Sequence, residues 1–363
     1  MRERLGRDRL GGLVRVLVVA SALLASGEAI PQTPSAKPPA TLRDTGLYSN
    51  FATREVDRKH LAFQPQYPLW TDGALKRRWI SLPPGTAIDG SDPDAWIFPV
   101  GTRFWKEFSF EGQPAETRYL ERLADGQWLY AAYEWSADGR EAHLAPERGR
   151  RGAVSLDGGR SHTIPGVSDC KVCHESNRTA VLGFSSLQLS PDIDPSALHS
   201  EPRPAPGVDL EYLIETDLLV GLPTSMHEAP PRIEAATATE RAALGYLHAN
   251  CGHCHNTEGP LRNLGLYLRH VENSADEPAL ASAVDRPIKK PAPGQSKEAV
   301  LRVEPGHPER SGLAQRMGSR YAALQMPPLG TELVDEQAME LVRQWIAGLG
   351  GLHTESQRER RGK

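Results

Sequence analysis

Two short stretches of the sequence share one pattern: Cys170-Lys171-Val172-Cys173-His174 and Cys251-Gly252-His253-Cys254-His255. Together they hold all 4 cysteines of the 363-residue chain. Two residues between the cysteines place both sulfurs on one side of a single helical turn, next to the following histidine. This C-x-x-C-H pattern is the attachment motif of c-type haem, with two thioether bonds and a histidine on the iron. The sequence therefore predicts two covalently bound haem c groups, with His174 and His255 as iron ligands.

A zinc site and two disulfides are the alternatives for four cysteines in one chain. The two cysteine pairs of a zinc ribbon are separated by about 15 to 20 residues, whereas Cys173 and Cys251 are much further apart. Neither alternative explains a histidine at the fifth position of both motifs. We therefore favour haem at both motifs.

The second motif lies in a segment, residues 233–351, with a helical apolar pattern at both ends. Thr239 can cap a helix that leads directly into Cys251. Near the other end, residues 334–349 follow the i, i+4, i+7 rhythm of an amphipathic helix. The glycines after this pattern are its expected end: Gly348, Gly350 and Gly351. Two helices are therefore expected to bracket the second haem site.

Between these helices lies Leu324-Gln325-Met326-Pro327-Pro328, a methionine on a loop that proline stiffens. A helix, C-x-x-C-H, a Met-Pro loop and a final helix with an aromatic residue resemble the class I cytochrome c fold. The resemblance implies that His255 is the proximal and Met326 the distal ligand of the second haem. A thioether ligand raises the reduction potential relative to two histidines. Met317 and Met339 lack such a loop and are expected in the core.

The stretch between His255 and Met326 is longer than in compact class I domains, and its prolines predict an inserted loop over 285–297. Three lysines lie in this loop: Lys289, Lys290 and Lys297. They form either a docking edge for a redox partner or a solvated cluster, and we favour the cluster.

The first motif lies in a proline-rich segment, residues 156–232, which leaves room for one convincing helix at about 209–219. The motif makes His174 the proximal ligand, but the sixth ligand of this iron stays open. The candidates are His162, His199, Met226 and His227, and a vacant position is the remaining alternative. An open iron can react with peroxide, whereas a closed one only passes electrons.

Residues 40–155 hold six of the 7 tryptophans and no cysteine. Short β-favouring runs alternate there with turn signals, at 77–82, 95–100, 102–110, 116–123 and 127–135. This spacing predicts an antiparallel β sandwich or barrel. Its core is expected to hold Trp79, Trp96, Trp105, Trp128 and Trp135, with an aromatic ligand-binding face as the alternative. The whole chain is then expected to be a multidomain α+β protein, in which mostly α-helical haem modules follow the β-rich region.

The chain also resembles an uncharacterised bacterial family of di-haem c-type cytochromes with an aromatic-rich N-terminal region. The matching stretches are residues 67–73 (Tyr-Pro-Leu-Trp-Thr-Asp-Gly), 82–85 (Leu-Pro-Pro-Gly), 98–102 (Phe-Pro-Val-Gly-Thr), 116–118 (Glu-Thr-Arg) and both haem motifs. The resemblance covers about residues 42–350. It implies the architecture and supplies no reaction.

The start of the chain has the pattern of an export signal. Arginines precede an apolar run at 16–25, and small residues follow it. The run is shorter than the about 20 residues of a membrane helix, so we expect a cleaved signal peptide over 1–29. The mature chain is then periplasmic or otherwise extracytoplasmic, has no stable membrane span, and ends in a charged tail over 352–363. A net charge of -4 gives no support to nucleic-acid binding.

These observations predict an exported di-haem electron carrier whose iron cycles between Fe(III) and Fe(II). Its partners are redox proteins or a small-molecule electron donor or acceptor. One alternative is a di-haem peroxidase or oxidase that uses an open first haem. Another is a binding module, in which the β region docks a substrate and the haems carry its electrons away.

Overall fold

The computed structural model describes residues 37–155, 159, 161–291 and 300–361, and for residues 351–361 only the backbone. The signal peptide predicted over 1–29 lies outside the described residues. The strands are β1 (Tyr48–Asn50), β2 (Glu55–Val56), β3 (Leu61–Ala62), β4 (Leu75–Ser81), β5 (Ile88–Asp89), β6 (Arg103–Phe110), β7 (Gln113–Arg122), β8 (Trp128–Trp135), β9 (Ala142–Leu144), β10 (Arg150–Ser155), β11 (Ser161–Ile164) and β12 (Leu219–Val220). The helices are α1 (Val167–His174), α2 (Leu210–Glu215), α3 (Ser225–Glu228), α4 (Ala238–Asn250), α5 (Pro278–Ala283), α6 (Gly312–Met317) and α7 (Glu336–Arg361).

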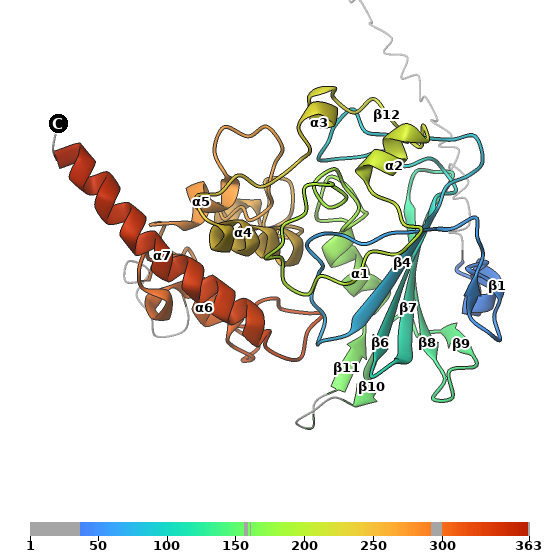
Figure 1. The fold of residues 1–363 in the computed structure, drawn as a ribbon. Coiled ribbons are helices and arrows are strands. Elements are labelled where there is room, and N and C mark those ends of the chain that lie inside the picture. The colour runs from blue at the N-terminus through green and yellow to red at the C-terminus, as the bar shows by residue number, and fades with distance from the viewer. Residues whose placement is uncertain (1–36, 156–158, 160, 292–299, 362–363) are drawn as a thin grey trace, which may run out of the picture. The chain divides into compact units, whose positions relative to one another are not determined.

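The N-terminal half is built on an antiparallel 6-stranded sheet in the order β3-β4-β6-β7-β8-β9 (Figure 1). Four of the predicted strands are confirmed, as β4, β6, β7 and β8. The strand predicted over 95–100 is wrong, because Ile97 makes only an isolated bridge to Asp89 and Pro99 has no N–H to donate to a ladder. A sandwich or barrel was expected, but this sheet is open, with β3 and β9 at its edges.

Both faces of the sheet are buried. On one face, Trp79, Trp105 and Trp135 pack with Leu42 and Leu47, from the start of the described chain. The other face is covered by Trp96 and by residues after the first motif, such as Phe184 and Leu189, and Cys170 packs at its edge. The tryptophan core is thus confirmed for four of the five side chains, while Trp128 is only half-buried. The first motif lies directly against this second face.

The helix leading into the second motif begins earlier than predicted. The side chain of Thr237, not that of Thr239, accepts the N–H of Glu240 and caps α4. Thr237 has the extended backbone that an N-cap needs, whereas Thr239 is already helical. In the proline-rich segment 156–232, the helix predicted over 209–219 is shorter than expected, because α2 ends at Glu215.

The final helix runs past the glycines that were expected to end it, so this part of the prediction is wrong. A Cβ atom on Gly350 would lie 2.9 Å from the Cα of Gly306. The N–H of Gly306 also donates to the carbonyl of Ile346, at 2.8 Å. Gly350 therefore allows α7 to pack closely on a turn, and it does not mark a helix end.

The helical core includes residues from the N-terminal half of the chain. Tyr67 and Trp70 are buried with α4 and α7, together with Met317 and Met339, which confirms both methionines as core residues. The backbone N–H of Trp70 donates to Oδ1 of Asn250 at the end of α4, at 2.8 Å. The sheet and the helical region are therefore joined through the 67–73 segment.

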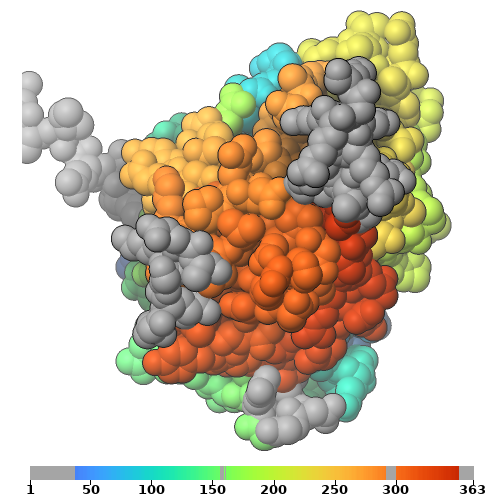
Figure 2. Space-filling view, turned by 90° about the vertical axis from the view of Figure 1, so that its left-hand side faces the viewer, coloured from blue at the N-terminus to red at the C-terminus, as the bar shows by residue number. Residues whose placement is uncertain are grey.

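The C-terminal helical region, orange to red in Figure 2, forms most of the face seen there. Lys289 and Lys290 are exposed, and Nζ of Lys289 donates to the carbonyl of Asn263, at 2.7 Å. Lys297 lies outside the described residues. Within the described part of the chain, no helix is both long enough and apolar enough to cross a membrane.

Glycine 245, in the middle of α4, provides a stability test of the joint with the 67–73 segment. A Cβ at Gly245 would lie 2.1 Å from the ring of Tyr67, whereas a Cβ at Gly348 of α7 meets nothing within 4 Å. We expect Gly245→Ala to lower the free energy of unfolding by about 1 to 3 kcal/mol, because overpacking exceeds the gain in helix propensity. Gly348→Ala should raise it by about 0.5 to 1 kcal/mol. Denaturant unfolding checks both, and an equal effect of the two substitutions would contradict this packing.

Candidate functional site

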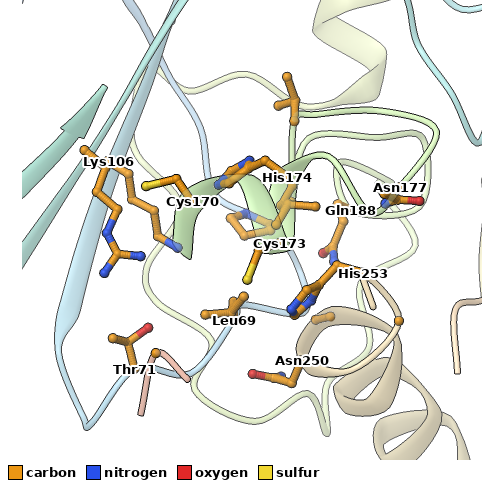
Figure 3. Close-up of a pocket in the computed structure, with 18 of the residues that line it drawn as sticks. Leu69, Thr71, Lys106, Cys170, Cys173, His174, Asn177, Gln188, Asn250 and His253 are labelled. Atoms are coloured by element: carbon orange, nitrogen blue, oxygen red, sulfur yellow. The ribbon is translucent and has the colours of Figure 1, made fainter. Parts of the chain in front are cut away.

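The first motif forms the last turns of α1. Gly166 precedes the helix, and its N–H donates to Oδ2 of Asp169, at 3.0 Å, which fixes the first turn. Helix α1 packs on β8, and the ring of His174 lies 5.4 Å from the ring of Tyr130. Cys170, Cys173 and His174 all line one cavity between α1 and the sheet (Figure 3). We call this the first cavity.

His174 is held in the state that an iron ligand needs. Its Nδ1 is 2.5 Å from the carbonyl of Ala180. A carbonyl only accepts, so Nδ1 carries the proton and Nε2 keeps its lone pair. Burial lowers the pKa of His174 to about 4, so the ring is neutral at physiological pH.

The second motif begins where α4 ends. Cys251 is the C-cap of α4, and its carbonyl accepts the N–H groups of Cys254, at 3.1 Å, and of His255, at 2.9 Å. This turn brings both cysteines and His255 to a second cavity of about 340 Å³. Burial lowers the pKa of His255 to about 4, which keeps this imidazole neutral as well.

The second cavity joins parts of the chain that are far apart in sequence. Met326 and His255 line the same cavity, as the class I resemblance implies, and Met317 of α6 lines it too. Much of the remaining wall is aliphatic: Leu261, Leu264, Leu266, Leu268, Ile288 and Leu313. This wall is suited to a large apolar ring, with the methionine sulfur and the imidazole as the metal-binding donors.

The two motifs meet at one point. The sulfurs of Cys173 and Cys254 and a ring nitrogen of His253 lie within 4.8 Å of one another. Figure 3 shows Cys173 close to His253, which lies beyond the end of α4. Cys173 and His253 line both cavities. The first and second cavities therefore adjoin each other where Cys173 and Cys254 lie.

Asn256 holds the two motifs together. Its Nδ2 donates to the carbonyl of Ser176, just after the first motif, at 2.9 Å, and to that of Gly252, at 3.1 Å. Its Oδ1 accepts the N–H groups of Glu258 and Gly259. Asn256 is 3% exposed, so these backbone groups have little access to water as a replacement partner.

The donors fit haem better than zinc. Cys173, His253 and Cys254 are three donors of the kind that zinc prefers, but a structural zinc site takes four, and Cys170 and Cys251 are not in this group. All 4 cysteines are free thiols, so no disulfide uses them. Each motif instead offers two thiols and a neutral imidazole to its own cavity. This is the donor set that a covalently bound porphyrin needs.

None of the four sixth-ligand candidates of the first haem lines the first cavity. His162 is 1% exposed and lies between two carboxylates, with Nε2 3.2 Å from Glu116 and Nδ1 3.6 Å from Asp72. His199 binds Asp335 at 2.8 Å. Met226 packs in the apolar core behind the sheet, and His227 is exposed on α3. The structure therefore supports none of them as a ligand.

Two other histidines line the first cavity, and sequence reasoning missed both. Nδ1 of His248 accepts the backbone N–H of His270, at 3.1 Å. Nδ1 of His253 is buried and has no partner among the described residues. The position of His253 inside the second motif was the signal, but only the folded chain brings it to the first cavity. Three cations of the sheet, Arg78, Lys106 and Arg118, were also missed.

Asn256→Ala tests the joint between the motifs. The substitution removes the hydrogen bonds to buried backbone on both sides, so we expect it to lower the free energy of unfolding by about 2 to 3 kcal/mol. The exposed Asn263, on the 3-10 helix Arg262–Leu264, is the matched control, and Asn263→Ala should change stability little. Denaturant unfolding measures both. Equal values for the two variants would show that Asn256 does not hold the motifs together.

Comparison of the chain with protein-family models, with curated proteins and with solved structures finds no match.

Proposed function

We propose that this chain is an exported c-type cytochrome that binds two haem groups, one at each motif, and transfers electrons between extracytoplasmic partners. The observation that carries the proposal is the meeting of Cys173 and Cys254 within 4.8 Å. Two cysteines of separate haem motifs at this distance bring the attached porphyrin edges together. A di-haem electron carrier needs such closeness, whereas two unrelated structural sites do not.

Haem iron supplies one-electron chemistry by changing between Fe(III) and Fe(II). The chain's own residues attach it, orient it and set its potential. Cys170 and Cys173 attach at the first cavity, where the Ala180 carbonyl orients His174 through Nδ1. Cys251 and Cys254 would attach it at the second cavity, where His255 and Met326 would be the ligands of the iron. The helical segment 233–351 then acts as a class I-like cytochrome c module.

The surroundings of the second cavity favour the reduced state. Aliphatic side chains limit water there, and Arg302 and Arg316 add positive charge to its lining. Both effects, together with the thioether of Met326, raise a reduction potential. Lys289 and Lys290 are exposed and also line this cavity, an arrangement that fits both a solvated cluster and a docking edge. A redox partner with an acidic surface fits this edge.

A di-haem peroxidase or oxidase is the second candidate function. The observation that favours it is the location of all four expected sixth ligands outside the first cavity. Cyanide binding to one haem of two, seen as a shift of its Soret band, distinguishes this function from simple electron transfer. Binding to neither haem excludes it and is consistent with His253 closing the first site.

Haem content tests the proposed function directly. In a host competent for cytochrome maturation, the mature protein should carry two haems, measured by intact mass and by pyridine haemochrome. Cys170→Ala with Cys173→Ala should leave one haem, and so should Cys251→Ala with Cys254→Ala, because each pair holds its own porphyrin. A colourless protein with the mass of the polypeptide alone would overturn the proposal.

Met326 and Met317 make a matched pair, because both line the second cavity. Met326→Leu should abolish the upfield-shifted methyl signals of an iron-bound methionine in the NMR spectrum of the reduced protein. It should also lower the reduction potential of the second haem, because the thioether stabilises Fe(II). Met317→Leu should keep both properties. Loss of these signals in Met317→Leu, but not in Met326→Leu, would show that Met317 and not Met326 binds the iron.

A further inference from the structure

Three cations lie side by side on the face of the sheet that forms the wall of the first cavity. Arg78 of β4 is directly opposite Lys106 of β6, and Lys106 is directly opposite Arg118 of β7. All three line the first cavity together with Cys170 and His174. Like charges directly opposite on neighbouring strands are destabilising. A row of three therefore needs negative charge close by.

The protein supplies carboxylates to the outer two cations only. Nη1 of Arg78 is 2.9 Å from Oε2 of Glu201, and Nη2 of Arg118 is 2.5 Å from Oε1 of Glu116. In the part of the chain that the structure describes, Lys106 makes no salt bridge. Its Nζ lies instead 4.9 Å from the ring centroid of Phe108. The middle of the row thus has no carboxylate partner to stabilise its charged form.

Several buried donors of the same cavity also lack an acceptor. Nη2 of Arg78 has no hydrogen-bond partner in the described structure, although the residue is only 5% exposed. The hydroxyls of Thr71 and Thr331 are buried without a partner as well. All three residues line the first cavity. Figure 3 shows the Lys106 side chain reaching from the sheet into the space beside Cys170 and Cys173, with Thr71 nearby.

An anionic occupant would supply the charge and the acceptors that these groups lack. Burial, followed by the charges of Arg78, Lys76 and Arg118, lowers the pKa of Lys106 well below its usual value. A polar group left unpaired in the interior costs free energy, and more so when it is charged. A carboxylate or inorganic oxyanion provides the missing acceptors and the missing charge in one group.

We propose that Lys106 and Arg78, flanked by Arg118, form an anion site that takes a carboxylate or oxyanion group in the first cavity. Thr71 and Thr331 are hydrogen-bond donors to the same group. The anion comes either from the propionates of the porphyrin attached at Cys170 and Cys173 or from a free small oxyanion that enters the cavity. The first source rests on the proposed function. In both cases the sheet residues of the β region form the wall of the first cavity that holds the anion.

The test uses the full mature holoprotein with Lys106→Met, which removes an amine that has no ion-pair partner among the described residues. Arg103→Met is the control, because Arg103 lies on the same strand but pairs with Glu121 at the surface. Haem content is measured first in all three proteins, and two haems per chain uphold the proposed function separately. If Lys106→Met does not fold, Arg78→Lys replaces it, because lysine retains the charge but loses Nη2.

For the propionate source, Lys106→Met shifts the resonance Raman propionate bands of the first haem and lowers its potential. Added inorganic phosphate or formate then leaves the Soret band of the first haem unchanged. For the free source, phosphate or formate perturbs the first Soret band of the wild type saturably, and Lys106→Met weakens this binding about tenfold or more. Arg103→Met behaves as wild type in both cases. Identical propionate bands, potentials and anion responses in all three proteins would overturn the anion site, even with both haems present.

Discussion

The site depends on one constraint: the turn after the first motif must touch the turn of the second. Glycine makes this contact possible. A Cβ on Gly259 would lie 2.6 Å from the carbonyl of Ser176. The side chain of Asn256 then donates hydrogen bonds to one backbone carbonyl of each turn, those of Ser176 and Gly252. Because Cys173 and Cys254 stand at this contact, the distance between the two cavities is set by backbone packing.

The same contact involves the β region. The 67–73 segment buries Tyr67 and Trp70 among the helices. Oδ1 of Asp72 accepts the N–H groups of Glu332 and Leu333, at 2.8 and 2.9 Å, a few residues after Met326. Oδ2 of Asp72 faces the buried His162. One short segment thus connects the sheet wall of the first cavity with the methionine loop of the second.

The strands and the helix that were predicted correctly depend on residues that are close together in the sequence. The strands β4, β6, β7 and β8 and the helix before Cys251 follow from apolar periodicity and turn residues. The two C-x-x-C-H motifs and Met326 are also local signals. The end of α7 was mispredicted because Gly350 serves a contact with Gly306, which is distant in sequence. The strand expected over 95–100 failed because a favourable composition does not supply a neighbour to pair with.

The features missed from the sequence all depend on register or on long-range packing. Lys106 occupies an inward position between Phe104 and Phe108, and a cation in that position was the available signal. Only the pairing of three strands, however, places Arg78 and Arg118 beside it. The proximity of His253 to Cys173 likewise requires the contact between the motifs. Single-residue patterns contain no information on such distances.

Circular dichroism in the Soret region of the oxidised holoprotein measures whether the two haems lie side by side. Two porphyrins attached at neighbouring cysteines couple excitonically. We expect a bisignate Soret signal that exceeds the sum of the signals of the two single-haem variants. A spectrum equal to that sum, with both haems present, would show that the motifs do not bring the haems together.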